Sequence, residues 1–207
     1  MQIGSAFGTD AYKNVRMHIA PWMILIGPAA AGKSTLGNGL ASVTGRSFVD
    51  VDALGENYYA EVGWSMDKLR DRIQAVGRVA AEHEWEPARA HAVERIVADY
   101  PGAIVSLGAG HSHYTQSELF QRVQATLRPV DHVVLVLPSF NHERSVQVLR
   151  QRSLATKGTD WISKDGHDFL CQWVHDPGNR VLATTVLYTE GEEPEQSISR
   201  LLQLISE

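Results

Sequence analysis

A run of small residues that ends in lysine and serine, "GPAAAGKST", occupies residues 27–35. Its two glycines, separated by four residues and followed by Lys33 and Ser34, fit the pattern of a loop that wraps phosphate groups. Glycine lets backbone N–H groups approach phosphate oxygens, and the helix that follows adds its positive N-terminal end. Lys33 then reaches the β- and γ-phosphates, and the Ser34 hydroxyl binds Mg²⁺. We expect the whole loop to bind ATP: Gly27, Pro28, Ala29, Ala30, Ala31, Gly32, Lys33, Ser34 and Thr35.

In two further segments, carboxylates or glycines stand at the end of an apolar run. Asp50 and Asp52 close the run "SFVDVD", and residues two apart on a strand point to the same face, so both carboxylates can serve one site near the phosphates. The alternative is a solvated turn with a helix cap. Gly108 and Gly110 follow the run "AIVSL", where missing side chains let another molecule approach the backbone. The alternative there is a plain turn from strand to helix.

Short apolar runs and amphipathic helical patterns alternate along the chain and must position these residues. The runs predict strands over residues 22–26, 47–51, 103–107, 132–137 and 184–188. The spacing of Leu36, Leu40 and Val43 predicts a helix over residues 33–44. The alternation indicates an α/β fold with a parallel sheet covered by helices on both faces, in which ligands bind at the carboxyl ends of the strands.

Capping residues and breakers predict the other helix ends. Thr115 with Glu118 fits a capping box that opens a helix ending near residue 127, and Asn141 is the expected N-cap of a later helix. The last helix is expected to start near Pro194. The long helical stretch before residue 100 is expected to break near Gly77 or Pro87. The segment "ATKGTDWISKDG", residues 155–166, has no clear period and predicts a mobile excursion.

The composition favours a small ligand over a polymer or a membrane. Nineteen Lys and Arg against 24 Asp and Glu give a net charge of −5 without long blocks of one sign, so we expect no nucleic-acid partner and no membrane partner. No apolar stretch approaches the roughly 18 residues of a membrane span. The single cysteine, Cys171, fits a reducing compartment. We expect a cytoplasmic protein that is a monomer or a weak dimer.

In order and spacing of its motifs the chain resembles the shikimate kinase family of small P-loop kinases. Beyond the phosphate loop, "FVDVDALGE" resembles that family's F-x-D-x-D-x-x-x-E segment, and "VSLGAGH" resembles its triple-glycine loop. The ending "NRVLATTVLYTEGEEPEQSI" is also similar to that of the family. The resemblance implies a three-layer P-loop NTPase fold with a five-stranded parallel sheet, and an ATP- and Mg²⁺-dependent kinase with a hydroxyl acceptor.

The resemblance also implies roles for individual residues. Asp52 would orient the acceptor hydroxyl and take its proton, Asp50 would hold Mg²⁺ through water together with Ser34, and Arg180 would grip a carboxylate. Arg150 and Arg152 lie within reach of the phosphates as catalytic cations, with Lys157 and Lys164 as further lid candidates. The expected acceptor site comprises Asp52, Glu56, Trp85, Arg89, Gly108, Ala109, Gly110, His111 and Arg180.

The chain departs from the family where the acceptor binds. The family has a second carboxylate-binding arginine in an F-R pair, and Glu86 and Pro87 occupy the matching place here, so Glu86 would repel a carboxylate unless Arg89, one turn on, replaces the lost partner. The rims of the expected pocket are instead rich in aromatic and imidazole groups, which suit a sugar, cyclitol, nucleoside or antibiotic-like acceptor.

Three functions therefore remain open at the level of the sequence. The first is a kinase of a small hydroxylated molecule, the second a true shikimate kinase that grips its substrate through Arg180 and Arg89, and the third a regulatory ATPase with a protein partner. In domain terms we expect residues 1–20 to be an N-terminal extension and residues 21–207 to be one P-loop kinase domain with a mobile lid at about residues 153–168.

Overall fold

The structure is a computed structural model that describes residues 19–206, and its centre is a five-stranded parallel sheet. The expected extension over residues 1–20 falls almost entirely outside these described residues. The spatial order of the strands is β2-β3-β1-β4-β5. The strands are β1 (Met23–Ile26), β2 (Phe48–Asp50), β3 (Ile104–Ser106), β4 (His132–Leu137) and β5 (Thr185–Tyr188). Each lies within a segment that the sequence predicts to be a strand.

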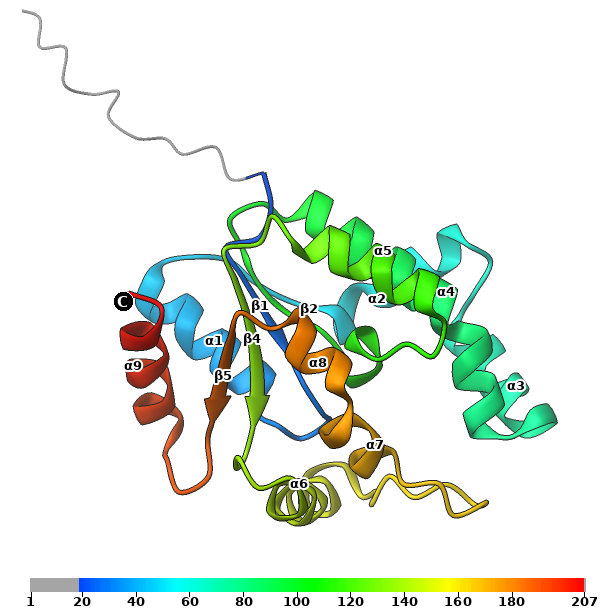
Figure 1. Cartoon of the computed structure of the whole chain (residues 1–207). Helices are drawn as coiled ribbons and strands as arrows, with labels where there is room; N and C mark the ends of the chain where they lie inside the picture. Colours follow the sequence, from blue (N-terminus) through cyan, green and yellow to red (C-terminus); the bar gives the residue numbers. More distant parts are fainter. Residues whose placement is uncertain (1–18, 207) are drawn as a thin grey trace, which may run out of the picture.

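At least one helix lies in every connection between successive strands, which is what parallel pairing requires. The helices are α1 (Lys33–Thr44), α2 (Val51–Glu61), α3 (Met66–Val76), α4 (Arg78–Asp99), η1 (Ala109–Ser112), α5 (Ser117–Leu127), α6 (His142–Lys157), α7 (Phe169–His175), α8 (Pro177–Leu182) and α9 (Pro194–Leu204). Helices α1 and α9 pack together on one face of the sheet, and α4, α5 and α8 cover the other face (Figure 1). The predicted three-layer α/β fold is confirmed.

The sheet forms the centre of the core because its strands are apolar on both sides. All four residues of β1 are fully buried, as are most of those in β3 and β4. Strands covered on both faces are typical of parallel sheets between helix layers. Polar groups therefore gather where β1, β2 and β3 end, and the parallel pairing brings those three ends to the same edge.

Several predicted helix ends are confirmed. Asn141 caps α6, since its side chain accepts a hydrogen bond from the N–H of Arg144 at 2.9 Å. The last helix begins at Pro194. The break in the long helical stretch falls at Gly77, whose φ of 83° suits glycine, and Pro87 lies inside α4 without ending it.

The capping box predicted at Thr115 and Glu118 is wrong. Helix α5 begins two residues later, and its N-cap, Gln116, makes no side-chain capping bond. The Thr115 hydroxyl and N–H both donate instead to the carboxylate of Glu86 on α4, at 2.8 and 2.9 Å. The buried Glu86 carboxylate therefore binds the Thr115 hydroxyl, which the local sequence pattern assigns to capping α5.

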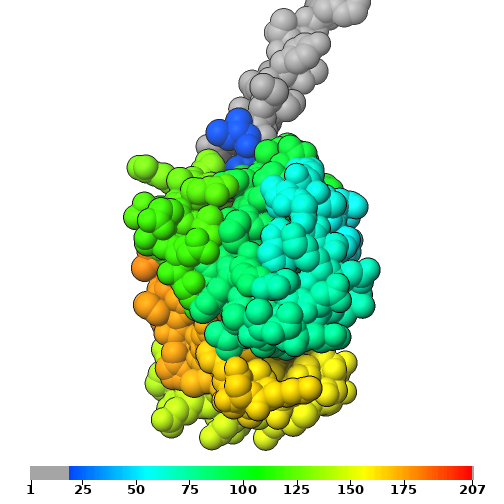
Figure 2. Space-filling model, turned by 90° about the vertical axis from the view of Figure 1, so that its right-hand side faces the viewer, coloured from blue at the N-terminus to red at the C-terminus, as the bar shows by residue number. Residues whose placement is uncertain are grey.

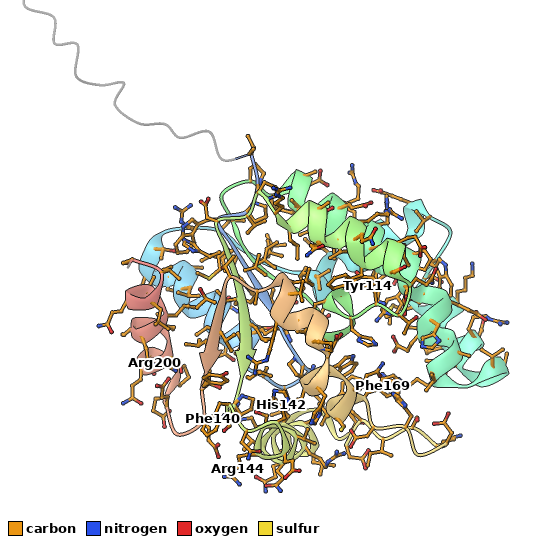
Figure 3. All side chains as sticks on the ribbon, viewed as in Figure 1. Tyr114, Phe140, His142, Arg144, Phe169 and Arg200 are labelled. Atoms are coloured by element: carbon orange, nitrogen blue, oxygen red, sulfur yellow. The ribbon has the colours of Figure 1, made fainter. Side chains whose placement is uncertain are left out.

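The predicted lid begins later than expected because α6 continues through Lys157 and ends at Gly158, which adopts a left-handed conformation. Residues 159–168 then form an irregular excursion closed by an isolated bridge between Ile162 and Asp168. We call residues 158–168 the lid. In the space-filling view this segment lies against the α3–α4 region (Figure 2). At its end Phe169, labelled in Figure 3, is buried and packs on Trp173 of α7.

Within the described residues, no helix combines the length and the apolar character that crossing a membrane requires.

Candidate active site

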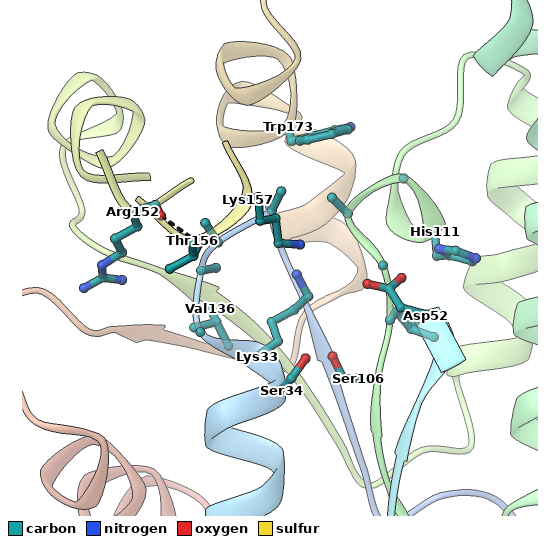
Figure 4. Close-up of a pocket in the computed structure, with 18 of the residues that line it drawn as sticks. Lys33, Ser34, Asp52, Ser106, His111, Val136, Arg152, Thr156, Lys157 and Trp173 are labelled. Carbon is teal, nitrogen blue, oxygen red and sulfur yellow. Dashed lines mark hydrogen bonds between the residues drawn. The ribbon is translucent and has the colours of Figure 1, made fainter. Parts of the chain in front are cut away.

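One cavity of about 700 Å³ opens at the carboxyl ends of the strands and joins the phosphate loop to the loop after β3. Its walls come from segments far apart in the chain (Figure 4). The phosphate-loop side contains residues 29–36, with Arg152, Thr156, Lys157, Thr189 and Glu192. The opposite side contains Asp52, Met66, Leu69, Arg78, Glu82, Trp85, residues 106–111, Trp161 and Trp173. We call this opposite side the acceptor side.

The backbone of the phosphate loop takes the path that its glycines allow. Gly27 has a φ of 128°, and a Cβ there would lie 2.6 Å from the carbonyl oxygen of Val136. Gly32 has a φ of 93° and leads into α1. Residues 29–35 line the cavity, whereas Gly27 and Pro28 lie behind it and contribute their carbonyl oxygens to Lys33. The loop therefore faces its backbone toward the cavity at the N-terminus of a helix, as anion binding requires.

Lys33 is the central cation of the cavity. Its ammonium donates to the carbonyl oxygens of Gly27 and Pro28, both at 2.8 Å, and the residue is only 8% exposed. Burial lowers the pKa of Lys33 from 10.5 to about 8; the nearby Asp52 opposes this shift and Lys157 adds to it. Figure 4 shows the ammonium of Lys157 directed toward that of Lys33. Two cations that face the same space form a site for an anion.

Ser34 and Asp50 are brought together, as the predicted metal role requires. The Ser34 hydroxyl donates to a carboxylate oxygen of Asp50 at 2.5 Å, and the other oxygen accepts from the N–H of Asp52 at 3.1 Å. Asp50 is thus the last residue of β2 and the N-cap of α2. In residues 19–206, no group of three or more His, Cys, Asp or Glu side chains forms a metal site, so a Mg²⁺ ion at Ser34 would depend on phosphate and water oxygens.

Asp52 and the loop after β3 form the floor of the acceptor side. Asp52 lies in the first turn of α2 and not on the strand, so the expectation that it shares a strand face with Asp50 is wrong; both nevertheless belong to one site, since Asp52 lines the cavity and Asp50 contacts Ser34. A Cβ on Gly108 would lie 2.9 Å from Oδ1 of Asp52 and 2.8 Å from Nδ1 of His111. The missing side chain of Gly108 therefore keeps the space between these two groups open.

His111 is a neutral imidazole at the cavity wall. Tyr59 Oη lies 2.7 Å from Nε2 of His111, and the imidazole is 3% exposed. Burial, aided by Arg89, lowers the pKa of His111 from 6.5 to about 3, while burial raises that of Tyr59. The Tyr59 hydroxyl and Nε2 of the neutral imidazole thus share one hydrogen bond, whose direction depends on the ring tautomer. Nδ1 of His111 has no hydrogen-bond partner among the described residues.

Three residues predicted to bind the acceptor lie elsewhere. The exposed Arg180 is on α8, and its guanidinium lies 3.2 Å from Nε2 of His142, labelled in Figure 3. The carboxylate of Glu56 accepts from the N–H of Met66, at 3.1 and 3.2 Å. Arg89 is 2% exposed and sits behind Gly110, where a Cβ would lie 2.0 Å from its Nη1. None of the three lines the cavity.

The two arginines predicted to be catalytic, Arg150 and Arg152, lie in different places. Arg150 donates to the carbonyl oxygen of Asp160 at 2.8 Å and pairs with Asp168, so it ties the two ends of the lid together outside the cavity. Arg152 lines the cavity, but Figure 4 shows its guanidinium directed away from Lys33. Lys157 is the lid-side cation that faces the phosphate loop.

Trp85 on α4 lines the cavity, as predicted, but sequence reasoning missed the other residues that α3, α4 and α7 supply to the acceptor side. Glu82 lies 3.5 Å from Arg78 and 3.4 Å from Arg89, and Trp173 packs on the lid residue Trp161 with ring centroids 5.2 Å apart. In the sequence, Arg78 and Glu82 look like part of an ordinary charged helix face, and Trp173 looks like an ordinary apolar position. Only the place of Arg78, directly after the helix-breaking Gly77, could have indicated that it lies near the site.

Comparison with known proteins rests on structure alone, since no protein-family model and no curated protein matches the sequence. A shikimate kinase from Acinetobacter baumannii in complex with shikimate superposes with a TM-score of 0.65 at 21% identity, over 91% of this chain and 93% of that one. The chain has the shikimate kinase fold. A shikimate kinase from Bacteroides thetaiotaomicron matches at 0.55 and 16% identity over 91% and 99% of the two chains, and a gluconokinase from Sinorhizobium meliloti 1021 at 0.56 and 16% over 91% and 93%.

These likenesses confirm the predicted P-loop kinase fold, and they cover about nine tenths of the chain. At such low identities a shared fold does not fix a shared substrate. Within this shikimate kinase fold, the acceptor must be inferred from the cavity's own residues.

Proposed function

We propose that the chain is an ATP- and Mg²⁺-dependent kinase that transfers the γ-phosphoryl group to a hydroxyl of a small molecule. The observation that carries the proposal is the single cavity in which the phosphate loop faces Asp52 and the loop after β3. A nucleotide-binding switch needs the first wall alone, whereas a kinase needs both, because donor and acceptor must meet in one water-excluding space.

The charged groups of the cavity support this chemistry. Asp52 is positioned to accept the proton that an acceptor hydroxyl loses as its oxygen bonds to the γ-phosphorus. Lys33 and Lys157 converge between Asp52 and the phosphate loop, where they can stabilise negative charge on the transferred group. Positioning and charge stabilisation supply most of the rate enhancement in this type of reaction.

The hydroxyl of Ser34 and the carboxylate of Asp50 fit a Mg²⁺ ion, because both present oxygen at one point beside the loop. Bound Mg²⁺ would neutralise charge on the nucleotide phosphates. Ser34 would contact the ion directly, and Asp50 would hold it through water while still capping α2.

Turnover tests the proposal directly. Purified protein with ATP and Mg²⁺ is incubated with a panel of cyclitols (shikimate included), sugars, nucleosides and aminoglycosides, and ADP release and phosphorylated product are measured. Lys33→Met should abolish turnover while its circular dichroism spectrum stays unchanged. Tight ATP binding without a phosphorylated product across the panel would count against the kinase, and a fully active Lys33→Met variant would remove the loop from the mechanism.

Lys157, the last residue of α6 before the lid, is the second cation in this proposal, and Lys164 in the lid offers a matched control. Lys157 lines the cavity, whereas the exposed Lys164 does not. Lys157→Met should lower kcat by about 10²-fold or more, the scale of losing one positioned charge in a transition state. Lys164→Met should retain normal turnover. Equal activity of the two variants would contradict the role of Lys157.

A further inference from the structure

The acceptor side of the cavity is walled by indole rings that the fold holds in place. Trp85 is 8% exposed and packs edge-on against Tyr59, with ring centroids 5.0 Å apart. Trp161 has a φ of 63°, a strained value for a residue other than glycine, and its indole N–H donates to the buried Ser153 hydroxyl at 2.7 Å. Trp173 is 4% exposed and packs against Trp161. Such fixed aromatic faces suit a flat apolar group on the ligand.

The two cations near this wall share one counter-ion. Glu82 lies between Arg78 and Arg89, with O···N distances of 3.5 and 3.4 Å. The Arg89 guanidinium also lies over the rings of Trp85 and Tyr114, at 5.3 and 5.8 Å from their centroids. Arg78 lies over the ring of Trp161 at 4.8 Å. Each guanidinium therefore has the Glu82 carboxylate and an aromatic face beside it, and this one carboxylate offsets one of their two positive charges.

The acceptor side carries no net positive charge. Asp52 and Glu82 are offset by Arg78 and by Arg89 behind Gly110, and His111 is neutral. The phosphate-loop side differs, since it contributes Lys33 and Lys157. A ligand that placed a carboxylate near a hydroxyl at Asp52 would therefore gain no net attraction from this wall and would be repelled by the Asp52 carboxylate in a partly desolvated space.

We propose that the acceptor is an alcohol that carries an aromatic ring and no carboxylate, with its ring against the indoles of Trp85 and Trp173 and its hydroxyl at Asp52. The inference rests on the proposed kinase function for the role of Asp52, but the preference for the ring and against the carboxylate comes from the walls alone. An ammonium group on the same compound is acceptable, because Glu82 and the indole faces both attract cations.

A matched set of small probes tests the proposal by binding, without turnover. 3-Phenyl-1,2-propanediol is neutral, 3-phenyllactate carries a carboxylate, phenylalaninol carries an ammonium group, and glycerol lacks the ring. Dissociation constants are measured by calorimetry, with and without ADP and Mg²⁺. The diol and phenylalaninol should bind at least tenfold more tightly than phenyllactate and glycerol. Equal binding of the three aryl compounds, a preference for phenyllactate, or no binding of any aryl compound would overturn the proposal.

A charge change on α4 sharpens the test. Glu82→Gln removes the counter-ion of Arg78 and Arg89, so phenyllactate should bind about tenfold more tightly to this variant while binding of the diol stays the same. Glu84→Gln is the matched control, because Glu84 is two residues away on the same helix and pairs with Arg72 at 2.6 Å outside the cavity. The proposal predicts no change there. If phenyllactate binds the two variants equally, the charge argument is wrong.

The two proposals fail differently. If the aryl preference holds but no aryl alcohol is phosphorylated when ATP is present, the kinase function fails and the pocket preference stands. If a carboxylate-bearing alcohol such as shikimate is phosphorylated more efficiently than the neutral aryl alcohols, the kinase stands and the acceptor class is overturned.

Discussion

The buried carboxylate of Glu86 should be one of the largest single contributors to the stability of this fold. Glu86 is 0% exposed and lies on α4. It accepts three hydrogen bonds from the start of α5: the hydroxyl and N–H of Thr115 donate to Oε1, and the N–H of Gln116 donates to Oε2 at 3.2 Å. The carboxylate thus supplies the cap that the side chains of α5 itself do not provide.

The cost of removing it follows from these three bonds. A hydrogen bond to a charged group contributes about 1.5–3 kcal/mol, and a buried donor left unpaired costs about 1–3 kcal/mol. Since neighbouring bonds are not additive, we expect Glu86→Ala to lower the free energy of unfolding by about 3–5 kcal/mol, the range for breaking a buried charged interaction. Glu86→Gln keeps one acceptor oxygen for Thr115 but turns an amide toward the N–H of Gln116, so about 1–3 kcal/mol is expected.

Urea unfolding at pH 7, followed by circular dichroism, measures both variants. The thermal midpoint of Glu86→Ala should fall by on the order of 10 °C, at about 2–4 °C per kcal/mol for a chain of this length. Glu84→Ala, at an exposed position on the same helix, should change the midpoint far less. The reasoning is refuted if Glu86→Ala costs less than about 1 kcal/mol, or if Glu86→Gln is as stable as the wild type.

Three further predictions concern the cavity. Because the pKa of His111 falls to about 3 on folding, only the unfolded chain binds a proton at this residue between pH 6.5 and 3. The contribution of His111 to stability is therefore full above pH 6.5, and the free energy of unfolding should fall by up to about 1.4 kcal/mol per pH unit below it. Urea titrations at several pH values should show a steeper fall for the wild type than for His111→Gln. Because the pKa of Lys33 is about 8, the binding of nucleotide phosphates near pH 8.5 should cause Lys33 to take up a proton. Calorimetry in buffers of different ionisation enthalpy measures this uptake, and a binding enthalpy that does not depend on the buffer would contradict it. Gly110→Ala should cost about 1–3 kcal/mol in thermal unfolding and change the fluorescence of Trp85, because the new Cβ displaces the buried Arg89; a wild-type midpoint would mean that the guanidinium moves freely.

The geometry of the loop over residues 27–35 could be predicted from the sequence because its determinants are local. Residues 27–35 are contiguous, and the strand and helix around them follow from apolar spacing that the structure confirms. Asp50 was also placed correctly beside Ser34, since a strand end next to the loop leaves it few other positions. Local backbone geometry and the edge of the sheet fix the loop and Asp50 before any long-range side-chain contact is considered.

The acceptor half depends on pairings that spacing does not encode. Thr115 fits a capping box by type and spacing, yet its hydroxyl is bound by Glu86, 29 residues earlier. Arg150 and Arg180 have the charge expected of ligand-binding residues, but one is held by Asp168 and the other points toward His142. In each case a partner distant in the chain decides what the side chain does.

Glu82 and Glu86 show how much rests on such pairings. They lie four residues apart on α4 and therefore on the same side of the helix, and in the sequence they are two equivalent acidic residues. Glu86 binds the start of α5 and does not line the cavity, whereas Glu82 lies at the wall between Arg78 and Arg89. If the start of α5 bound Glu82 instead, Arg78 and Arg89 would each lose the one carboxylate that pairs with it among the described residues. The charge of the acceptor that this cavity accepts thus depends on which of two neighbouring glutamates the start of α5 binds.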